Sequence, residues 1–210
     1  MPGRVRYGGP AAPSPSCPGG IVTVPSPLDV RALDLAQDAT ATAVHRIGRA
    51  AYAVEAELIG FDGIPALRES LTQMREQPLH WLGAVAQDGS IAGFLAWQEQ
   101  PDGSACIDRL CVSPAWFRRG AASLLLRHVL SELLPGRTVT VTTGAANTPA
   151  LTLYTRLGFT RGPDFSPAPG LTMAAFTADG SGPAGRSGRA GRSGRAGVRG
   201  AGSGAEPRAL

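Results

Sequence analysis

Two tight-turn signals divide residues 81–112 into three consecutive strand segments. The apolar segment Trp81 to Ala86 ends at Asp88-Gly89, a dipeptide that favours the tight turn of a β-hairpin. The segment Ile91 to Gln98 ends at Pro101-Asp102-Gly103, and Ser113-Pro114 ends a third segment, Ala105 to Val112. Because short turns join antiparallel neighbours, we predict a three-stranded antiparallel meander. The chain is therefore restricted to folds built on a β-sheet.

Segments with helical periodicity lie on both sides of this meander. Apolar residues at three- and four-residue spacing predict a helix that is capped by Asp38 or Thr40 and ends near Ile59. We further predict a strand over 28–33, a helix opened by Ile64-Pro65, a helix over 121–134, a strand over 138–143, a helix over 149–157 and a strand over 171–176. This order of elements indicates a mixed α/β fold.

Composition divides the 210 residues into one domain with two tails. Residues 1–20 are rich in Pro, Gly and Ser, and residues 178–210 repeat Arg, Gly and one small residue. Neither segment has enough apolar side chains to offset the entropy lost on ordering, so we predict a disordered leader and a disordered tail. Residues 21–177 form the predicted domain.

The net charge of +4 belongs to the tails, because residues 21–177 hold 12 arginines against 14 acidic residues. The domain thus shows no basic surface for nucleic acid, and we expect no such partner. The tail itself has two interpretations, an Arg/Gly arm that associates with RNA or a solvated segment. The absence of interleaved aromatic residues favours the second.

No stretch reaches the ~18 unbroken apolar residues of a membrane helix, and the leader lacks the apolar run of a secretory signal. We therefore expect a cytoplasmic protein without a membrane partner. The cysteines Cys17, Cys106 and Cys111 have no paired spacing, and simple strand alternation turns the last two to opposite faces. We expect reduced thiols and no metal site; the histidines also lack metal-ligand spacing.

The segment from Leu110 to Leu125 leads from a strand through a turn into a helix that opens with small residues. The first amides of a helix have no internal partner, and the helix dipole is positive there. Gly120 and Ala122 leave those amides accessible, and Arg118 and Arg119 add positive charge. This pattern favours a pyrophosphate group, although it is also common in simple tight connections.

Two spacings in this region resemble the GNAT superfamily of acetyl-CoA-dependent N-acetyltransferases. Val112, Pro114, Gly120 and Ala122 keep that family's spacing for the strand end and the cofactor turn, with Phe117 at the usual Gln or Arg position. Asn147, Ala150, Tyr154 and Gly158-Phe159 resemble its second block. The resemblance implies a central, mixed and mostly antiparallel sheet flanked by helices, with acetyl-CoA wedged between two strands that splay apart.

The resemblance also implies roles for residues. The cofactor-binding set is Leu110, Cys111, Val112, Arg118, Arg119, Gly120, Ala121, Ala122, Ser123, Asn147 and Tyr154. In such enzymes the amine attacks the thioester directly in a ternary complex, the Val112 N–H polarises the carbonyl, and Tyr154 is the general acid. Without this context, Tyr154 would be interpreted as a packed aromatic residue.

The amine must lose a proton, and Asp108 is the candidate base. Simple alternation places it on the strand face of Leu110 and Val112. The alternative is a structural ion pair with Arg109 or a residue of the neighbouring strand. Glu55, Glu57 and Asp62, near the end of the first helix, either bind a cationic acceptor or are solvated.

The predicted function is transfer of acetyl to a small-molecule or peptide amine. A CoA-binding sensor that keeps the fold without turnover is the alternative, and Phe117 favours it. The identity of the acceptor and the oligomeric state, including a homodimer, are left open.

Overall fold

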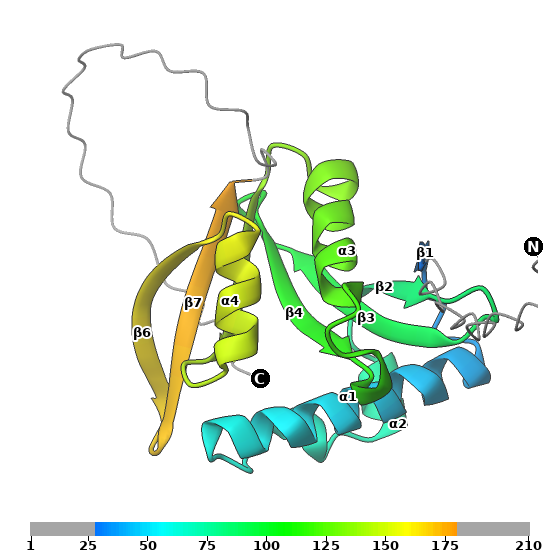
Figure 1. Ribbon diagram of the computed structural model, residues 1–210, viewed down its shortest axis with the longest axis horizontal. Helices are drawn as coiled ribbons and strands as arrows, with labels where there is room; N and C mark the ends of the chain where they lie inside the picture. Colours follow the sequence, from blue (N-terminus) through cyan, green and yellow to red (C-terminus); the bar gives the residue numbers. More distant parts are fainter. Residues whose placement is uncertain (1–27, 180–210) are drawn as a thin grey trace, which may run out of the picture.

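The computed structural model describes residues 28–179, so the predicted leader and most of the predicted tail lie outside the described residues. The described part forms a seven-stranded sheet in the order β1-β2-β3-β4-β5-β7-β6. All neighbouring strands are antiparallel except β4 and β5, which are parallel. The predicted mixed α/β fold with a mostly antiparallel sheet is confirmed (Figure 1).

The strands other than β6 follow the predicted segments closely. They are β1 (Asp29–Ala32), β2 (His80–Val85), β3 (Ile91–Glu99), β4 (Ala105–Val112), β5 (Thr138–Gly144), β6 (Thr160–Ala168) and β7 (Leu171–Asp179). The two predicted turns are present, and Gly89 and Gly103 both adopt φ of 83°, which glycine reaches without steric penalty. Strand β7 continues to Asp179, two residues past the predicted end of the domain.

Strand β6 was not predicted, because its sequence lacks alternation. It contains Gly162, Pro163 and Pro167 and is almost wholly exposed. It forms by pairing with β7 at the edge of the sheet, where proline is tolerated. This strand therefore depends on a tertiary partner.

The helices are α1 (Asp38–Ile59), α2 (Leu71–Arg75), α3 (Ala121–His128) and α4 (Thr148–Arg156). Short 3-10 turns occupy η1 (Pro65–Leu67) and η2 (Pro114–Trp116), and α3 continues as a π-helix, η3 (Val129–Leu133). Two predictions of detail are wrong. The N-cap of α1 is Gln37, without a side-chain cap, and the helix predicted from Ile64-Pro65 is divided by Ser70. Ser70 forms a capping box with Gln73 that starts a separate helix.

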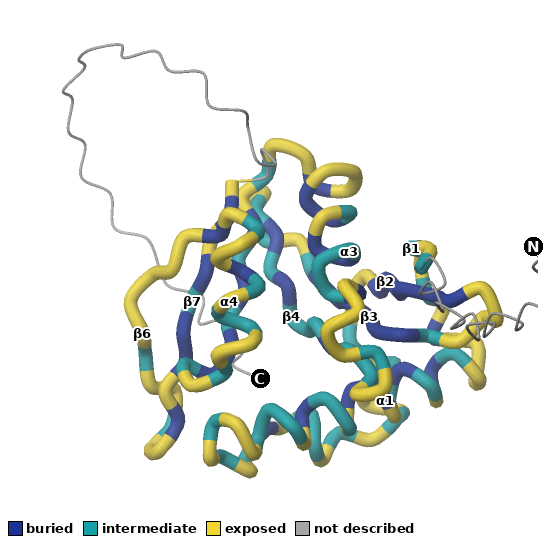
Figure 2. The backbone as a smooth tube through the Cα atoms, viewed as in Figure 1, coloured by how far each residue is buried: buried dark blue, intermediate teal, exposed yellow. Residues whose placement is uncertain are grey.

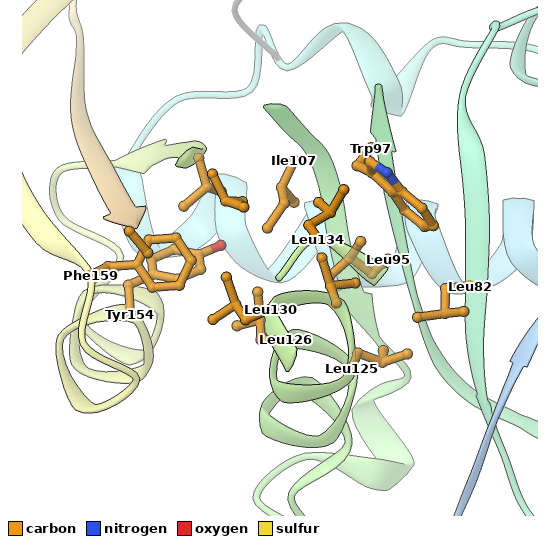
Figure 3. Packing of buried hydrophobic residues seen from close by; sticks show 14 of the residues in the cluster. Leu82, Leu95, Trp97, Ile107, Leu125, Leu126, Leu130, Leu134, Tyr154 and Phe159 are labelled. Carbon is orange, nitrogen blue, oxygen red and sulfur yellow. The ribbon is translucent and has the colours of Figure 1, made fainter. Parts of the chain in front are cut away.

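Two apolar clusters cover the two faces of the sheet. One contains residues of α3 and α4, and Figure 3 shows its leucines from α3 and η3 packed against Ile107 and Leu95. The other contains residues of α1 and α2 packed against Trp81 and Phe94. Figure 2 shows burial concentrated in the central strands, with exposure at the outer helix surfaces and β6. No helix within 28–179 has the length and apolar character needed to cross a bilayer.

Candidate functional site

Strands β4 and β5 separate towards their C-terminal ends. They pair only from Ala105 to Ile107 and from Val139 to Val141. Beyond these residues β4 remains paired with β3 as far as Val112, and β5 remains paired with β7 as far as Gly144. In Figure 1, α3 lies on one side of β4, and α4 with β7 lies on the other. The inner edge of β4 after Ile107 therefore lacks a strand partner.

The backbone pattern of β4 directs alternate amides to this edge. The N–H of Ser113 donates to the Ala92 carbonyl of β3, at 2.8 Å. Because successive residues of a strand point their N–H groups to opposite edges, Val112 and Leu110 direct theirs towards the diverging β5. Cys111 directs its main-chain groups to β3.

Gly93 lies opposite Val112 and allows this close approach of β3 and β4. A Cβ atom on Gly93 would lie 2.8 Å from the Cys111 carbonyl oxygen and 3.1 Å from Val112 Cα. These are backbone atoms, so they have little freedom to move away. A glycine is thus required on the strand that supports the open edge.

A β-bulge in β4 changes the predicted position of Asp108. Ala96 of β3 pairs with Arg109 and Trp97 pairs with Ile107, which leaves Asp108 as the extra residue. Ile107, Leu110 and Val112 belong to the α3 side of the sheet, whereas Asp108 and Arg109 both line a cavity with Tyr52 of α1. The prediction that Asp108 shares a face with Leu110 and Val112 is therefore wrong.

The same bulge corrects the prediction for the two cysteines. Cys106 lies between Ala105 and Ile107, whose side chains face α3, so its own side chain faces the opposite side. Cys111 belongs to the cluster under α1. Both cysteines consequently point to the same side of the sheet.

The turn before α3 leaves its first amides uncapped. Gly120, the N-cap residue, adopts φ of 85° and has no side chain, and the first helical residues are Ala121, Ala122 and Ser123. Arg118 also has positive φ, at 61°, an uncommon conformation for a residue with a side chain. Arg119 stacks on Trp116, with its guanidinium carbon 5.2 Å from the ring centre. Phe117 is 40% exposed.

Tyr154 of α4 is buried in an aromatic cluster. The ring packs against Phe159 and Phe176, with centroids 5.5 and 5.3 Å away. No hydrogen bond joins its hydroxyl to another of residues 28–179. Figure 3 shows its oxygen directed away from Phe159 and towards the side that holds Ile107. Burial, together with the Glu55 carboxylate, raises the pKa of Tyr154 above its usual range.

Glu55 of α1 connects this helix to the end of β5 and the start of α4. Its Oε1 accepts hydrogen bonds from Thr143 Oγ1 at 3.0 Å, from Asn147 Nδ2 at 3.0 Å and from the Gly144 N–H at 3.4 Å. Asn147 Nδ2 also donates to Thr143 Oγ1, and Asn147 Oδ1 accepts from the Ala150 N–H at the start of α4. Of the three carboxylates considered in the sequence, Glu57 and Asp62 are exposed, whereas Glu55 lies within the site.

Asp108, Arg109 and Glu69 form an ion-pair cluster on the α1 side of the sheet. Arg109 donates from both terminal nitrogens to the two oxygens of Glu69, at 2.5 and 2.9 Å, and from Nε to Asp108 Oδ2 at 2.9 Å. Its guanidinium also lies over the Trp81 ring, at 5.6 Å. Burial alone would lower the pKa of Arg109, but the bonds to Glu69 and Asp108 raise it above its usual value.

A cavity of about 680 Å³ opens beside this cluster. Its walls come from α1, η1, α2 and the bulge of β4. Among the lining residues are Tyr52, Arg68, Glu69, Asp108 and Arg109. Burial raises the pKa of Tyr52 well above its usual value, so its hydroxyl keeps its proton. The cavity therefore combines an aromatic wall with both signs of charge.

Cys111 is enclosed under α1. Burial, followed by the Glu55 carboxylate, raises the pKa of its thiol to about 12, although Tyr52 acts in the opposite direction. Cys111 as a whole is 1% exposed, and its thiol stays protonated near neutral pH. It therefore lacks the properties of a nucleophilic cysteine.

A sequence model of the Acetyltransferase (GNAT) family matches residues 46–159, more than half of the chain. The chain belongs to the GNAT acetyltransferase family. The UPF0157 protein YqkA of Bacillus subtilis is 34% identical over 126 residues, which are 60% of this chain and 36% of that protein. This chain thus spans about a third of the length of that relative.

Solved structures share the GNAT fold at low sequence identity. The ribosomal-protein-S18-alanine N-acetyltransferase of Escherichia coli is 21% identical, with a TM-score of 0.56 over 73% of this chain and 94% of that one. The PaiA N-acetyltransferase of Thermoplasma acidophilum, solved in complex with coenzyme A, is 14% identical, with a TM-score of 0.56 over 70% and 97%. These likenesses concern the fold.

The structure brings most of the predicted GNAT site residues to one region. The strand end, the cofactor turn, Asn147 and Tyr154 surround the divergence of β4 and β5, and Asp108 lies on the other side of the sheet edge. Sequence reasoning missed Tyr52 and Glu69. Tyr52 was hidden in the apolar face of α1, and Glu69 lies in a connection without periodicity.

Proposed function

We propose that this chain transfers the acetyl group of acetyl-CoA to an amine by direct attack in a ternary complex. The observation that carries the proposal is the divergence of β4 and β5 beyond Ile107 and Val141, with the Val112 N–H directed into it. Membership in the acetyltransferase family supports acyl transfer as the reaction class.

The residues around the divergence suit acetyl-CoA. The uncapped amides of Ala121, Ala122 and Ser123 would hold the pyrophosphate, supported by Arg118 and Arg119. The dipole of α3 contributes only about 0.3–1 kcal/mol, so directed amide hydrogen bonds supply most of the binding energy. The N–H of Val112 would polarise the thioester carbonyl. Asn147 donates its amide hydrogens to Glu55 and Thr143, so any contact with the cofactor would use its remaining oxygen lone pair.

Tyr154 would stabilise the departing thiolate. A phenol of ordinary pKa ~10 that donates a proton to a thiolate of pKa ~8.5 works uphill by about 2 kcal/mol, and burial of Tyr154 makes the transfer harder still. The hydroxyl therefore acts mainly as a positioned hydrogen-bond donor while the C–S bond breaks, with proton transfer completed late. The hydroxyl makes no hydrogen bond with the other described residues, which leaves it free to donate one in this role.

Asp108 would receive the proton of the amine. Removal of the proton from an alkylammonium of pKa ~10.4 costs about 4.6 kcal/mol of free energy at pH 7. Asp108 lines the cavity; its Oδ2 is bound to Arg109, whereas its Oδ1 has no hydrogen-bond partner among the described residues. The free amine then attacks the thioester carbon and the C–N bond forms. The C–S bond breaks, the thiolate leaves towards Tyr154, and it becomes the free thiol with the second proton of the nitrogen, relayed through the Tyr154 hydroxyl. Protonated, buried Cys111 supports direct transfer rather than an acetyl-cysteine intermediate.

The test is thiol release from acetyl-CoA across a panel of amines, with wild type compared with Tyr154→Phe. General acid catalysis predicts a loss of about 10²-fold or more in kcat for the variant, with CoA binding retained. A variant within twofold of a competent wild type would refute the role of Tyr154. Tight CoA binding without turnover of any amine would instead favour a CoA sensor, the alternative suggested by Phe117 at the cofactor turn.

A further inference from the structure

The charged groups that line the cavity beside β4 differ in how many of their polar atoms already have hydrogen-bond partners. Both carboxylate oxygens of Glu69 accept from Arg109, and Arg109 is held by Glu69, Asp108 and the Trp81 ring. These three residues are largely committed to one another, and their side chains are between 11% and 29% exposed. They leave one anionic atom available to a ligand, Asp108 Oδ1.

A second charge in the cavity wall is available. Arg68, directly before Glu69, also lines the cavity, is exposed, and makes no ion pair or side-chain hydrogen bond within residues 28–179. Arg109 satisfies Glu69, so that carboxylate does not neutralise Arg68. The cavity therefore offers one open carboxylate oxygen in its β4 wall and one open guanidinium in its η1–α2 wall.

We propose that the acceptor is an amine that also carries an anionic group, in the class of free amino acids. This inference rests on the proposed acetyl transfer. The ammonium binds Asp108 Oδ1, next to the open edge of β4, and the carboxylate binds the Arg68 guanidinium. A guanidinium matches a carboxylate in shape and donates two parallel hydrogen bonds. The cavity of about 680 Å³ has room for a side chain, which the Tyr52 ring would contact.

A plain polyamine fits this charge pattern less well. It would place a second cation near Arg68, where like charges repel, and Glu69 could not compensate without releasing Arg109. Because the two available groups have opposite sign, they favour a zwitterion over a dication. The acceptor would also have a preferred direction in the cavity.

The experiment compares amino acids with their decarboxylated amines in the thiol-release assay: phenylalanine with phenethylamine, and lysine with cadaverine. We expect kcat/KM for each amino acid to exceed that of its amine by about tenfold or more. Arg68→Gln should raise the KM of the amino acids by about tenfold, leave that of phenethylamine unchanged and lower that of cadaverine, whose second cation the arginine repels. Arg46→Gln, an exposed arginine of α1 outside the cavity lining, is the matched control and should change neither series.

The outcomes separate this inference from the proposed function. Turnover of the plain amines equal to or faster than that of the amino acids would overturn the inference and leave the transferase intact. An Arg68→Gln variant that affects both series equally would also overturn it. No thiol release with either series or with any other amine of the panel, in a protein that binds CoA, would overturn the proposed function and this inference together.

Discussion

The contacts of Glu55 predict that α1 is held to the C-terminal end of β5 by one carboxylate oxygen. Substitution by alanine removes the acceptor of three donors, from Thr143, Gly144 and Asn147. Asn147 keeps Thr143 Oγ1 as a partner, so its amide is not orphaned. Thr143, which is 4% exposed, and the Gly144 N–H are left without their acceptor.

The expected magnitude follows from these two donors. A hydrogen bond to a charged group contributes about 1.5–3 kcal/mol, and the 3.4 Å bond from Gly144 is at the weak end. Because Glu55 is partly exposed and water can replace some of the loss, we expect Glu55→Ala to lower the free energy of unfolding by about 2–3 kcal/mol. Glu55→Gln keeps an oxygen at the same position and should lose about 1 kcal/mol or less.

Urea denaturation followed by circular dichroism measures these differences. Glu57→Ala is the control, because Glu57 lies two residues away on the same helix, is exposed and makes no described side-chain bond. It should stay within about 0.5 kcal/mol of wild type. The reasoning is refuted if Glu55→Ala is as stable as Glu57→Ala, or if Glu55→Gln loses as much as Glu55→Ala.

Three further predictions concern residues of β3 and β4. Gly93→Ala places a Cβ 2.8 Å from the Cys111 carbonyl oxygen, so we expect a loss of about 1–3 kcal/mol in urea denaturation and a raised KM for acetyl-CoA; unchanged values would contradict the close approach of β3 and β4. Cys111→Ala should keep kcat within a few-fold, because the buried thiol takes no part in transfer; a loss of activity with wild-type CoA binding would favour an acetyl-cysteine intermediate. Burial raises the pKa of the Cys111 thiol to about 12, so its contribution to stability is complete below the ordinary range near ~8.5 and is lost as pH rises towards 12. The unfolding free energy of wild type should therefore fall between pH 9 and pH 12 more steeply than that of Cys111→Ala, and equal slopes would contradict this origin.

Much of the fold could be predicted from local signals. Turns at Gly89 and Gly103 and the apolar spacing of α1 depend on residues close in sequence, and these elements have nearly the predicted bounds. Strand β6 could not be predicted, because its exposed, proline-containing sequence acquires strand structure only from β7. The division at Ser70 was signalled by a capping box, but Leu67, Leu71 and Met74 continued a helical spacing across it.

The candidate site could likewise be predicted only in part from the sequence. The spacing of Val112, Gly120, Asn147 and Tyr154 is a property of the sequence, and it was sufficient to indicate the family. The environment of Glu55 could not be predicted from the sequence, because its hydrogen-bond partners are about 90 residues away along the chain. Burial of Tyr154 also depends on packing between elements that are distant in sequence, because its ring lies against Phe176 of β7.

Asp108 shows most clearly what only the tertiary structure decided. The sequence by itself determined a carboxylate four residues before Val112, and strict alternation then turned it to the cofactor side. One extra residue in the pairing of β4 with β3 moves the Asp108 side chain to the opposite face of the sheet, because a strand alternates its side chains with a period of two. The residue was thereby moved from the cofactor side to the cavity, where Arg109 and Glu69 leave it one open oxygen. Sequence spacing set which residues the chain places at the end of β4, and the bulge set which face of the sheet each of their side chains reaches.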